Sequence, residues 1–250
     1  MLTPQQAASI LDWLGPERPG PLVGQHVALT GHGVILVDRW PEPRVALSAT
    51  ADNLSLAGDP AALTPEEARA HVAGYLEAPE PFVSLVRAAF PEAPAWDRII
   101  YELEGPPRPV PAVDAVVRRL SVTDAYHLWA LSRDSSWISK TWGGPPGLAA
   151  SGMAWGAFVG ERLVSVACVF FVGRELEEIG VVTEPAYRGR GLSRACVHGL
   201  CGDIIARGHR PSWTTSPDNL ASKGVAERLG FTFRRHDLLY AVGIPIPASD

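Results

Sequence analysis

Cysteine is scarce in this chain, and the three that occur limit the chemistry open to it. Cys168, Cys196 and Cys201 stand at neither metal-ligand nor disulfide spacing, and the last two fall within one expected helix. We therefore expect buried, reduced thiols and no metal site.

An excess of basic charge and long apolar runs are also missing. The 22 basic and 27 acidic residues leave a net charge of −5, which is not the electrostatic footprint of a nucleic-acid-binding protein. No apolar run reaches the roughly 18 residues that cross a membrane. The N-terminus lacks the basic and apolar segments of a secretory signal. The sequence therefore predicts a cytoplasmic protein with neither nucleic acid nor membrane as a partner.

One stretch, residues 179–199, has the pattern of an anion site. A β-branched run leads to a glycine-rich turn, and a helix-like apolar pattern follows the turn. Gly189 and Gly191 allow backbone N–H groups to approach a ligand closely, and the first helical turn leaves its own N–H groups unpaired. Arg188 and Arg190 add positive charge to that of the helix dipole. The pattern predicts a site for a phosphate or pyrophosphate.

The first part of the chain, residues 1–108, predicts a small α+β domain. The expected elements are a helix from Thr3 to Gly15, strands at 33–38, 44–48 and 54–56, helices at 64–76 and 82–90, and a strand at 98–103. Four prolines within residues 104–111 can sustain neither a helix nor a strand ladder, so we place a domain boundary there.

The second part, residues 112–250, alternates strands and helices. The expected elements are a strand at 116–120, a helix from Thr123, a loop at 133–151, strands at 153–159, 163–172 and 175–183, a helix at 192–207, a strand at 213–215, a helix at 218–230 and a strand pair at 231–242. This order predicts a mixed α/β sheet with helices on both faces. The loop contains Trp137 and Trp142, which either cover a substrate or fill the edge of the core.

Two segments of the second part carry a family resemblance. The run V-T-E-P-A-Y-R-G-R-G-L-S and the run N-L-A-S-K-G-V-A-E-R-L-G-F that begins at Asn219 resemble the GNAT superfamily of N-acetyltransferases. The pyrophosphate signature of that family falls on Arg188, Gly191 and Ser193, where the small serine replaces a glycine or alanine. V-D-R-W-P-E-P-R-V-A-L and L-A-G-D-P, in the first part, resemble a two-part subgroup. The resemblance implies that the mixed sheet is mostly antiparallel. In the two-part interpretation the first domain is a degenerate copy of the same fold.

Other phosphate-binding loops do not fit the residues. A dinucleotide fingerprint needs a third glycine where Arg194 stands, and a nucleoside-triphosphate loop needs a Gly-Lys-Ser/Thr run that the chain lacks. The resemblance implies acetyl-CoA as the acyl donor. The residues it implies for donor binding are Val181, Val182 and Thr183 along the pantetheine arm, Arg188, Gly189, Arg190, Gly191, Leu192 and Ser193 at the pyrophosphate, and Asn219 and Ser222 beside the arm. Asn219 is equally typical of a plain helix cap.

Acetyl transfer to an amine requires a general base, because only the neutral amine is a nucleophile. The resemblance implies a glutamate on the strand before the turn, where Glu177 and Glu178 both stand. Successive side chains in a strand point to opposite faces, so only one of them can face the substrate. Likeness to the two-part subgroup favours Glu178, and the spacing to Arg188 favours Glu177. For each of the two glutamates, the alternative interpretation is a solvated charge at the end of a strand.

The tyrosine that serves the family as general acid is missing, since Ala226 occupies its place. Ser222, His236, Tyr240 or solvent are the substitutes that the sequence offers. Two functions therefore stay open: an N-acetyltransferase acting on a small-molecule amine, and a catalytically weak acyl-CoA-binding sensor or partner-binding module. A homodimer is compatible with the resemblance.

Overall fold

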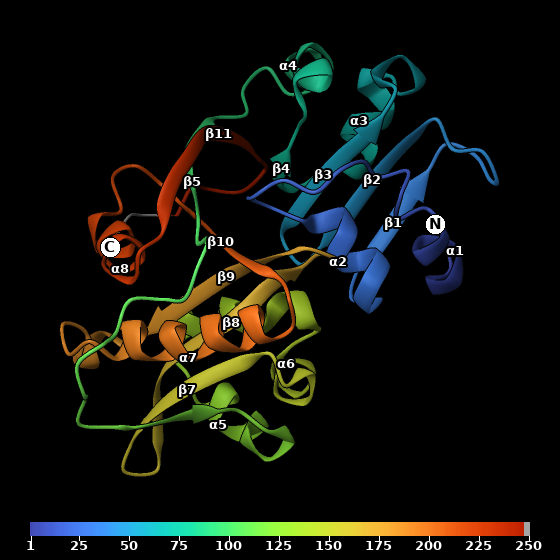
Figure 1. The fold of residues 1–250 in the computed structure, drawn as a ribbon. Coiled ribbons are helices and arrows are strands. Elements are labelled where there is room, and N and C mark those ends of the chain that lie inside the picture. Colours follow the sequence, from blue (N-terminus) through green and yellow to red (C-terminus); the bar gives the residue numbers. More distant parts are fainter. Residues whose placement is uncertain (248–250) are drawn as a thin grey trace.

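A computed structural model describes residues 1–247 and contains one sheet of eleven strands (Figure 1). In spatial order the strands are β1 (Val34–Val37), β2 (Val45–Thr50), β3 (Asn53–Gly58), β4 (Gly74–Glu77), β11 (Thr232–Val242), β5 (Ala95–Glu102), β10 (Arg210–Thr215), β9 (Leu176–Thr183), β8 (Arg162–Val172), β7 (Ala154–Val159) and β6 (Val116–Arg119). Neighbouring strands are antiparallel except in the pairs β3–β4 and β9–β10. The predicted mixed, mostly antiparallel sheet is confirmed.

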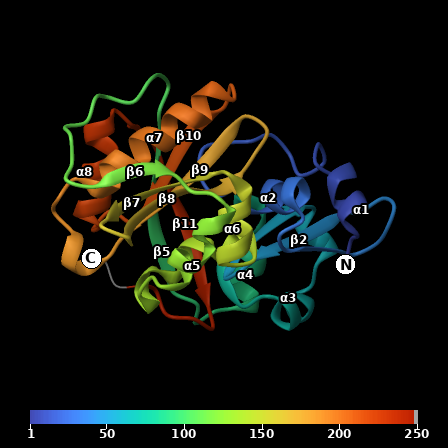
Figure 2. The ribbon, with the colours of Figure 1, turned by 90° about the horizontal axis from the view of Figure 1, so that it is seen from below.

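Helices cover both faces of this sheet, as the sequence predicts. The α-helices are α1 (Pro4–Ser9), α2 (Val23–Thr30), α3 (Pro65–His71), α4 (Val83–Ala89), α5 (Ala125–Trp129), α6 (Pro145–Ser151), α7 (Leu192–Ala206) and α8 (Leu220–Leu229), and the short 3₁₀ helices are η1 (Pro60–Ala62), η2 (Glu80–Phe82), η3 (Val122–Asp124), η4 (Arg133–Trp142) and η5 (Pro185–Tyr187). Figure 2 shows α7 and α6 on opposite sides of β8. Within residues 1–247 no helix is long and apolar enough to cross a membrane.

Side-chain contacts agree with this layering. In β7, Trp155 lies against Gly199 of α7, where an added Cβ would come within 2.5 Å of the indole. In β8, Cys168 is one residue beyond the partner of Trp155, so its side chain points to the other face. There its thiol donates a hydrogen bond to the carbonyl of Ile138 in η4. The sheet is therefore buried on both sides around β7–β9.

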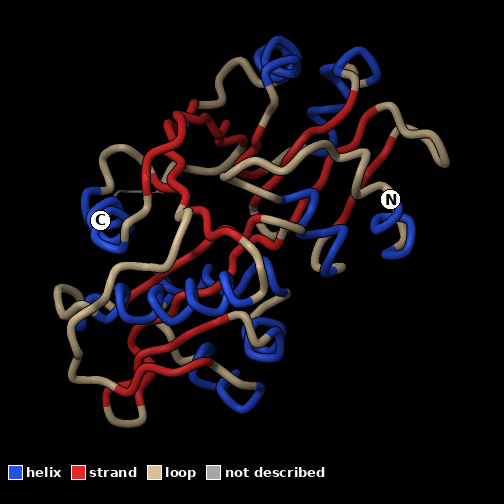
Figure 3. The backbone as a smooth tube through the Cα atoms, viewed as in Figure 1, coloured by secondary structure: helices blue, strands red, loops and turns tan. Residues whose placement is uncertain are grey.

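The proline-rich segment joins two parts of one sheet. Residues 103–115 run from β5 to β6 without helix or strand (Figure 3). However, β5, which precedes this segment, lies between β10 and β11, which follow it. Hydrogen bonds therefore connect the two sides of the predicted boundary, and the division into domains 1–108 and 112–250 stays a prediction.

Several predictions of secondary structure in the first half need correction. The first helix ends at Ser9, and residues 10–14 form turns instead of continuing the helix to Gly15. The helix that begins after Thr64 has the expected capping box, but it ends at His71 instead of continuing to residue 76. Gly74 has a φ of +136°, and an added Cβ there would lie 2.5 Å from the carbonyl oxygen of Asp52. Because the backbone passes so close to the start of β3, residues 74–77 join the sheet as β4, parallel to β3.

Helix α2 was not expected from the sequence. It consists largely of valine, threonine, glycine and histidine, which are weak helix formers. Tertiary contacts stabilise it, chiefly through the fully buried His26. Its Nε2 lies 2.9 Å from the carbonyl oxygen of Thr141, and its Nδ1 lies 3.2 Å from the backbone nitrogen of Val172. This ring therefore connects α2 to η4 and β8.

Two predictions in the second half are also wrong. The predicted loop 133–151 folds as η4 and α6, and in it Trp142 is only 5% exposed and donates a 2.7 Å hydrogen bond to the carbonyl of Val169. Trp142 thus fills the core. The predicted strand pair at 231–242 is one strand, β11, with a bulge between Phe233 and Arg235. The strand continues through its charged middle because Arg235 to Tyr240 pair residue by residue with β5.

Candidate active site

The parallel strands β9 and β10 separate in the middle of the sheet. They pair only where residues 210–213 of β10 face residues 176–179 of β9. Beyond this point β9 continues to Thr183 alongside β8, while β10 continues alongside β5. The segment that contains Val181, Val182 and Thr183 therefore has one open edge, and its side chains are half-buried. An extended ligand can pair with such an edge as an additional strand.

The glycine-rich turn lies directly beyond the end of β9. Gly189 and Gly191 have φ values of +76° and +77°, in the left-handed region that glycine adopts without strain. Helix α7 begins at Leu192, and no side chain of the described residues caps its N-terminus with a hydrogen bond. The N–H groups of its first turn, Ser193 included, therefore remain available to an anion.

Arginine side chains fix this turn to the strand and the short helix before it. The Nε of Arg188 donates a 3.4 Å hydrogen bond to the carbonyl of Thr183. The guanidinium of Arg190 donates to the carbonyl of Ala186 and lies 5.0 Å from the ring centre of Tyr187. These contacts hold both arginine side chains against the segment that precedes α7, and their role at an anion stays a prediction.

The N-terminus of α8 lies at the same separation of strands. The side chain of Asn219 caps the helix by accepting a 2.8 Å hydrogen bond from the backbone N–H of Ser222. The hydroxyl of Ser222 accepts a 3.0 Å bond from the indole N–H of Trp213, the last β10 residue that pairs with β9. Asn219 is therefore a helix cap, and a contact between its remaining amide group and a ligand stays a prediction.

The two candidate glutamates point to opposite faces of the sheet. The Glu177 side chain is 0% exposed and lies on the face covered by α7. Its carboxylate lies 2.5 Å from the Arg207 guanidinium and 2.8 Å from the Nδ1 of His209. Both of its oxygens are thus held by residues that follow α7, which suits a structural ion pair.

Glu178 has a different environment. Its side chain is 5% exposed, and its buried Oε2 has no hydrogen-bond partner among residues 1–247. Burial raises the pKa of this carboxyl to about 7, although the nearby Thr214 hydroxyl and Arg98 guanidinium act in the opposite direction. A carboxyl with a free oxygen and a pKa near neutrality has the properties of a general base.

Glu178 belongs to a group of polar side chains that we call the polar cluster. It consists of Glu178 in β9, Ser212 and Thr214 in β10 and Arg98 in β5. Each has a buried polar atom that lacks a hydrogen-bond partner in the described part of the chain. Ser212 is in register with Glu178, and strand alternation puts all four on one face. An unpaired buried polar atom costs about 1–3 kcal/mol, so such a group is typical of a site completed by a ligand or by water.

Sequence reasoning did not find Arg98, Ser212 or Thr214. They belong to no motif, and only the place of β5 beside β10 brings Arg98, two strands away from Glu178, close enough for the two charges to attract each other. Two of the proposed acids lie elsewhere. His236 and Tyr240 project from the face of β11 opposite to that of Asp237, the residue in register with Arg98.

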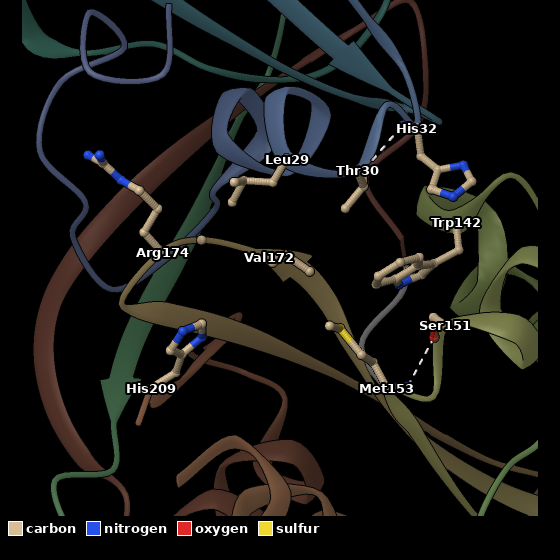
Figure 4. A pocket seen from close by; sticks show the side chains of 10 residues that line it. Leu29, Thr30, His32, Trp142, Ser151, Met153, Val172, Arg174 and His209 are labelled. Atoms are coloured by element: carbon tan, nitrogen blue, oxygen red, sulfur yellow. Dashed lines mark hydrogen bonds between the residues drawn. The ribbon is translucent and has the colours of Figure 1, made fainter. Parts of the chain in front are cut away.

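A cavity of about 440 Å³ lies at the far end of β8 from the glycine-rich turn (Figure 4). The residues around it include Leu29, His32, Trp142, Met153, Arg174 and His209. It shares no residue with the polar cluster. Nowhere in residues 1–247 do three or more His, Cys, Asp or Glu side chains come together in a way that could hold a metal ion.

Comparison with known proteins finds relatives that are named as GNAT proteins or N-acetyltransferases. The model of a family described as GNAT acetyltransferase matches residues 114–240. An uncharacterized N-acetyltransferase encoded in the mutA 5′ region of Streptomyces virginiae is 41% identical over 202 residues, which are 79% of this chain and 84% of the relative. The crystal structure of a GCN5-related N-acetyltransferase-like protein from Streptococcus suis has a TM-score of 0.72 at 18% identity, covering 95% of this chain and 98% of the other. A tandem GNAT protein from the clavulanic acid biosynthesis pathway has a TM-score of 0.56 at 14% identity, covering 95% and 94%.

Proposed function

The chain belongs to the GNAT acetyltransferase family, and from that premise we propose that it transfers the acetyl group of acetyl-CoA directly to the primary amine of a small molecule, with Glu178 as the general base. Acetyltransferases of this family use acetyl-CoA. The single observation that carries the assignment of the base is the buried, unpartnered Oε2 of Glu178 beside the separation of β9 and β10.

The residues around that separation fit the donor. The open edge at residues 181–183 would pair with the pantetheine arm, and the N–H groups of residues 189–193 would hold the pyrophosphate together with Arg188 and Arg190. Asn219 and Ser222 would border the arm from the start of α8. Acetyl-CoA supplies the acetyl group as a thioester.

Glu178 prepares the acceptor for transfer. It accepts a proton from the acceptor's ammonium group, either directly or through a water molecule, and so leaves a neutral amine. The amine nitrogen then bonds to the acetyl carbon as the carbon–sulfur bond breaks, and the sulfur leaves with the electron pair. The nitrogen gives up its second proton, which the Ser222 hydroxyl or a water molecule relays to the sulfur, so that the amide and the CoA thiol are both neutral. The protonated Glu178 returns its proton to solvent. The low dielectric around Glu178 brings its pKa close to neutrality, so it is both ionised and basic at physiological pH.

A kinetic comparison of the two glutamates tests this proposal. Calorimetry measures acetyl-CoA binding, and release of the CoA thiol is followed across a panel of primary amines. We expect Glu178→Gln to lower kcat by about 10²–10⁴-fold and to leave the dissociation constant of acetyl-CoA unchanged. Glu177→Gln is the matched control, because it makes the same change on the opposite face of β9. Equal losses of kcat in the two variants would refute the assignment of the base.

The second function, a catalytically weak acyl-CoA-binding sensor, is favoured by one observation. Ala226 is fully buried where the family carries its acid, so no side chain of α8 supplies a phenol there. The same panel separates the two functions. Binding of acetyl-CoA without thiol release for any amine would support the sensor and contradict the transferase.

A further inference from the structure

Building on the proposed function, we propose that the acceptor carries a carboxylate next to its amine, as a free amino acid does, and that Arg98 binds this carboxylate. Arg98 lies in β5, and its guanidinium carbon is 3.9 Å from the ring centre of Trp96. Its Nε is buried and, in the part of the chain that the structure describes, has no hydrogen-bond partner. Stacking on an aromatic ring fixes the plane of a guanidinium and leaves its N–H edges free for a planar, bidentate acceptor such as a carboxylate.

The other cations around the polar cluster are already paired. Arg18 lies 2.9 Å from Glu77, and Arg235 lies 2.7 Å from Asp237. Arg98, in contrast, makes no ion pair within residues 1–247, although Glu178, Asp218 and Asp237 attract it from a longer distance. In this part of the face Arg98 is thus the cation that a ligand would neutralise.

Glu178 and Arg98 lack hydrogen-bond partners of opposite kinds. The carboxylate has a free oxygen and the guanidinium a free N–H, yet no hydrogen bond joins the two groups. A ligand that brings an ammonium group to Glu178 and a carboxylate to Arg98 would satisfy both, because each of its charges meets the opposite one. An amino acid has both groups within a few atoms of each other.

Other small amines fit this face less well. A polyamine or an aminoglycoside would place a second cation near the Arg98 guanidinium, where like charges repel in a medium of low dielectric. A simple monoamine would leave the buried Nε of Arg98 without a partner. The charge pattern therefore selects amino acids from the range of primary amines.

Paired acceptors that differ only in the carboxylate test the inference. Initial rates of thiol release are measured at pH 8, with saturating acetyl-CoA, for the common L-amino acids and for their C-terminal amides. The amine of an amide is the less basic of each pair, so basicity alone would favour the amide. We expect at least one free amino acid to exceed its own amide by tenfold or more in kcat/KM. A charge-assisted hydrogen bond contributes about 1.5–3 kcal/mol, or roughly 10–150-fold.

Substitution of Arg98 tests whether this residue causes the preference for the acid over the amide. We expect Arg98→Ala to remove the preference for the acid over the amide by raising KM for the acid, while the dissociation constant of acetyl-CoA stays the same. The acid-to-amide ratio cancels any change that the variant causes in the basicity of Glu178. Arg18→Ala is the matched control, because it removes one positive charge from the same face without touching Arg98. It should leave the ratio intact.

The outcomes distinguish a failure of this inference from a failure of the proposed function. Amides or simple amines that match or exceed all free amino acids would overturn this inference while leaving the acetyltransferase proposal standing. Equal effects of Arg98→Ala on acids and amides would also overturn it. Absence of thiol release for every amine would instead refute the proposed function. If Arg98→Ala does not fold, as judged by its thermal melt, the comparison of acids with amides in the unmodified protein still tests whether the acceptor carries a carboxylate.

Discussion

The pH dependence of acetyl transfer follows from the environment of Glu178, which must be ionised to accept a proton. Burial raises the pKa of its carboxyl from 4.5 to about 7. With that value about one tenth of the molecules carry an ionised Glu178 at pH 6 and about nine tenths at pH 8. We therefore expect kcat/KM for the acceptor to fall about tenfold for each pH unit below about 7.

The assay is the initial rate of thiol release at saturating acetyl-CoA, with low acceptor concentrations, between about pH 5 and pH 9. Thr214→Val removes one of the groups that lower the pKa of Glu178, so the inflection should move to higher pH. Glu178→Gln should lose the inflection and retain a low, flat rate in this range. An inflection near pH 4.5, or one near pH 7 that survives in Glu178→Gln, would refute the reasoning.

The same carboxyl links stability to pH. The folded protein keeps the Glu178 proton up to about pH 7, whereas the unfolded chain loses it near 4.5, so the free energy of unfolding decreases as the pH rises between these values. The change from 4.5 to about 7 corresponds to about 3 kcal/mol. Glu178→Gln stays neutral and should exceed the wild type by up to that amount at pH 8 in urea denaturation, and should equal it at pH 4. Equal stability of the two at pH 8 would contradict the burial argument.

Two further predictions concern His26 and the anion turn. Burial lowers the pKa of His26 from 6.5 to about 4, so the unfolded chain binds a proton first and stability should decrease by about 3 kcal/mol as the pH falls through this window. In urea denaturation, the free energy of unfolding of His26→Phe should not show this decrease at low pH. An unchanged pH dependence in the variant would show that another group is responsible. Gly191→Glu places bulk and negative charge at the uncapped N-terminus of α7 and should abolish acetyl-CoA binding in calorimetry. Gly208 also has a positive φ, +83°, and lies at the other end of α7, so Gly208→Glu should bind acetyl-CoA normally. Unchanged affinity in Gly191→Glu would argue against the site.

Local patterns predicted most of the second half of the chain. The β-branched run of β9, the glycine-rich turn and the amphipathic helices each carry their signal within a few residues. Helix α2 gave no such signal because its stability depends on partners that are distant in sequence. The two hydrogen bonds of His26 reach residues 115 and 146 positions away along the chain. Periodicity within a short window contains no information of that kind.

The candidate site was predictable only in part for the same reason. The turn and the pair Glu177 and Glu178 follow from the sequence of one strand and one loop. Which glutamate is free depends on Arg207 and His209, which approach β9 from one face only. The place of Arg98 depends on the insertion of β5 between β10 and β11, a long-range pairing that strand propensity does not specify.

The crystal structure of the complex with acetyl-CoA tests the central claim most directly. We expect the pantetheine arm to extend the sheet along residues 181–183 in the separation of β9 and β10, with the pyrophosphate on the N–H groups of residues 189–193 and the thioester next to Glu178. Acetyl-CoA bound elsewhere, for example in the 440 Å³ cavity at the far end of β8, with the N-terminus of α7 making no contact to it, would contradict the account.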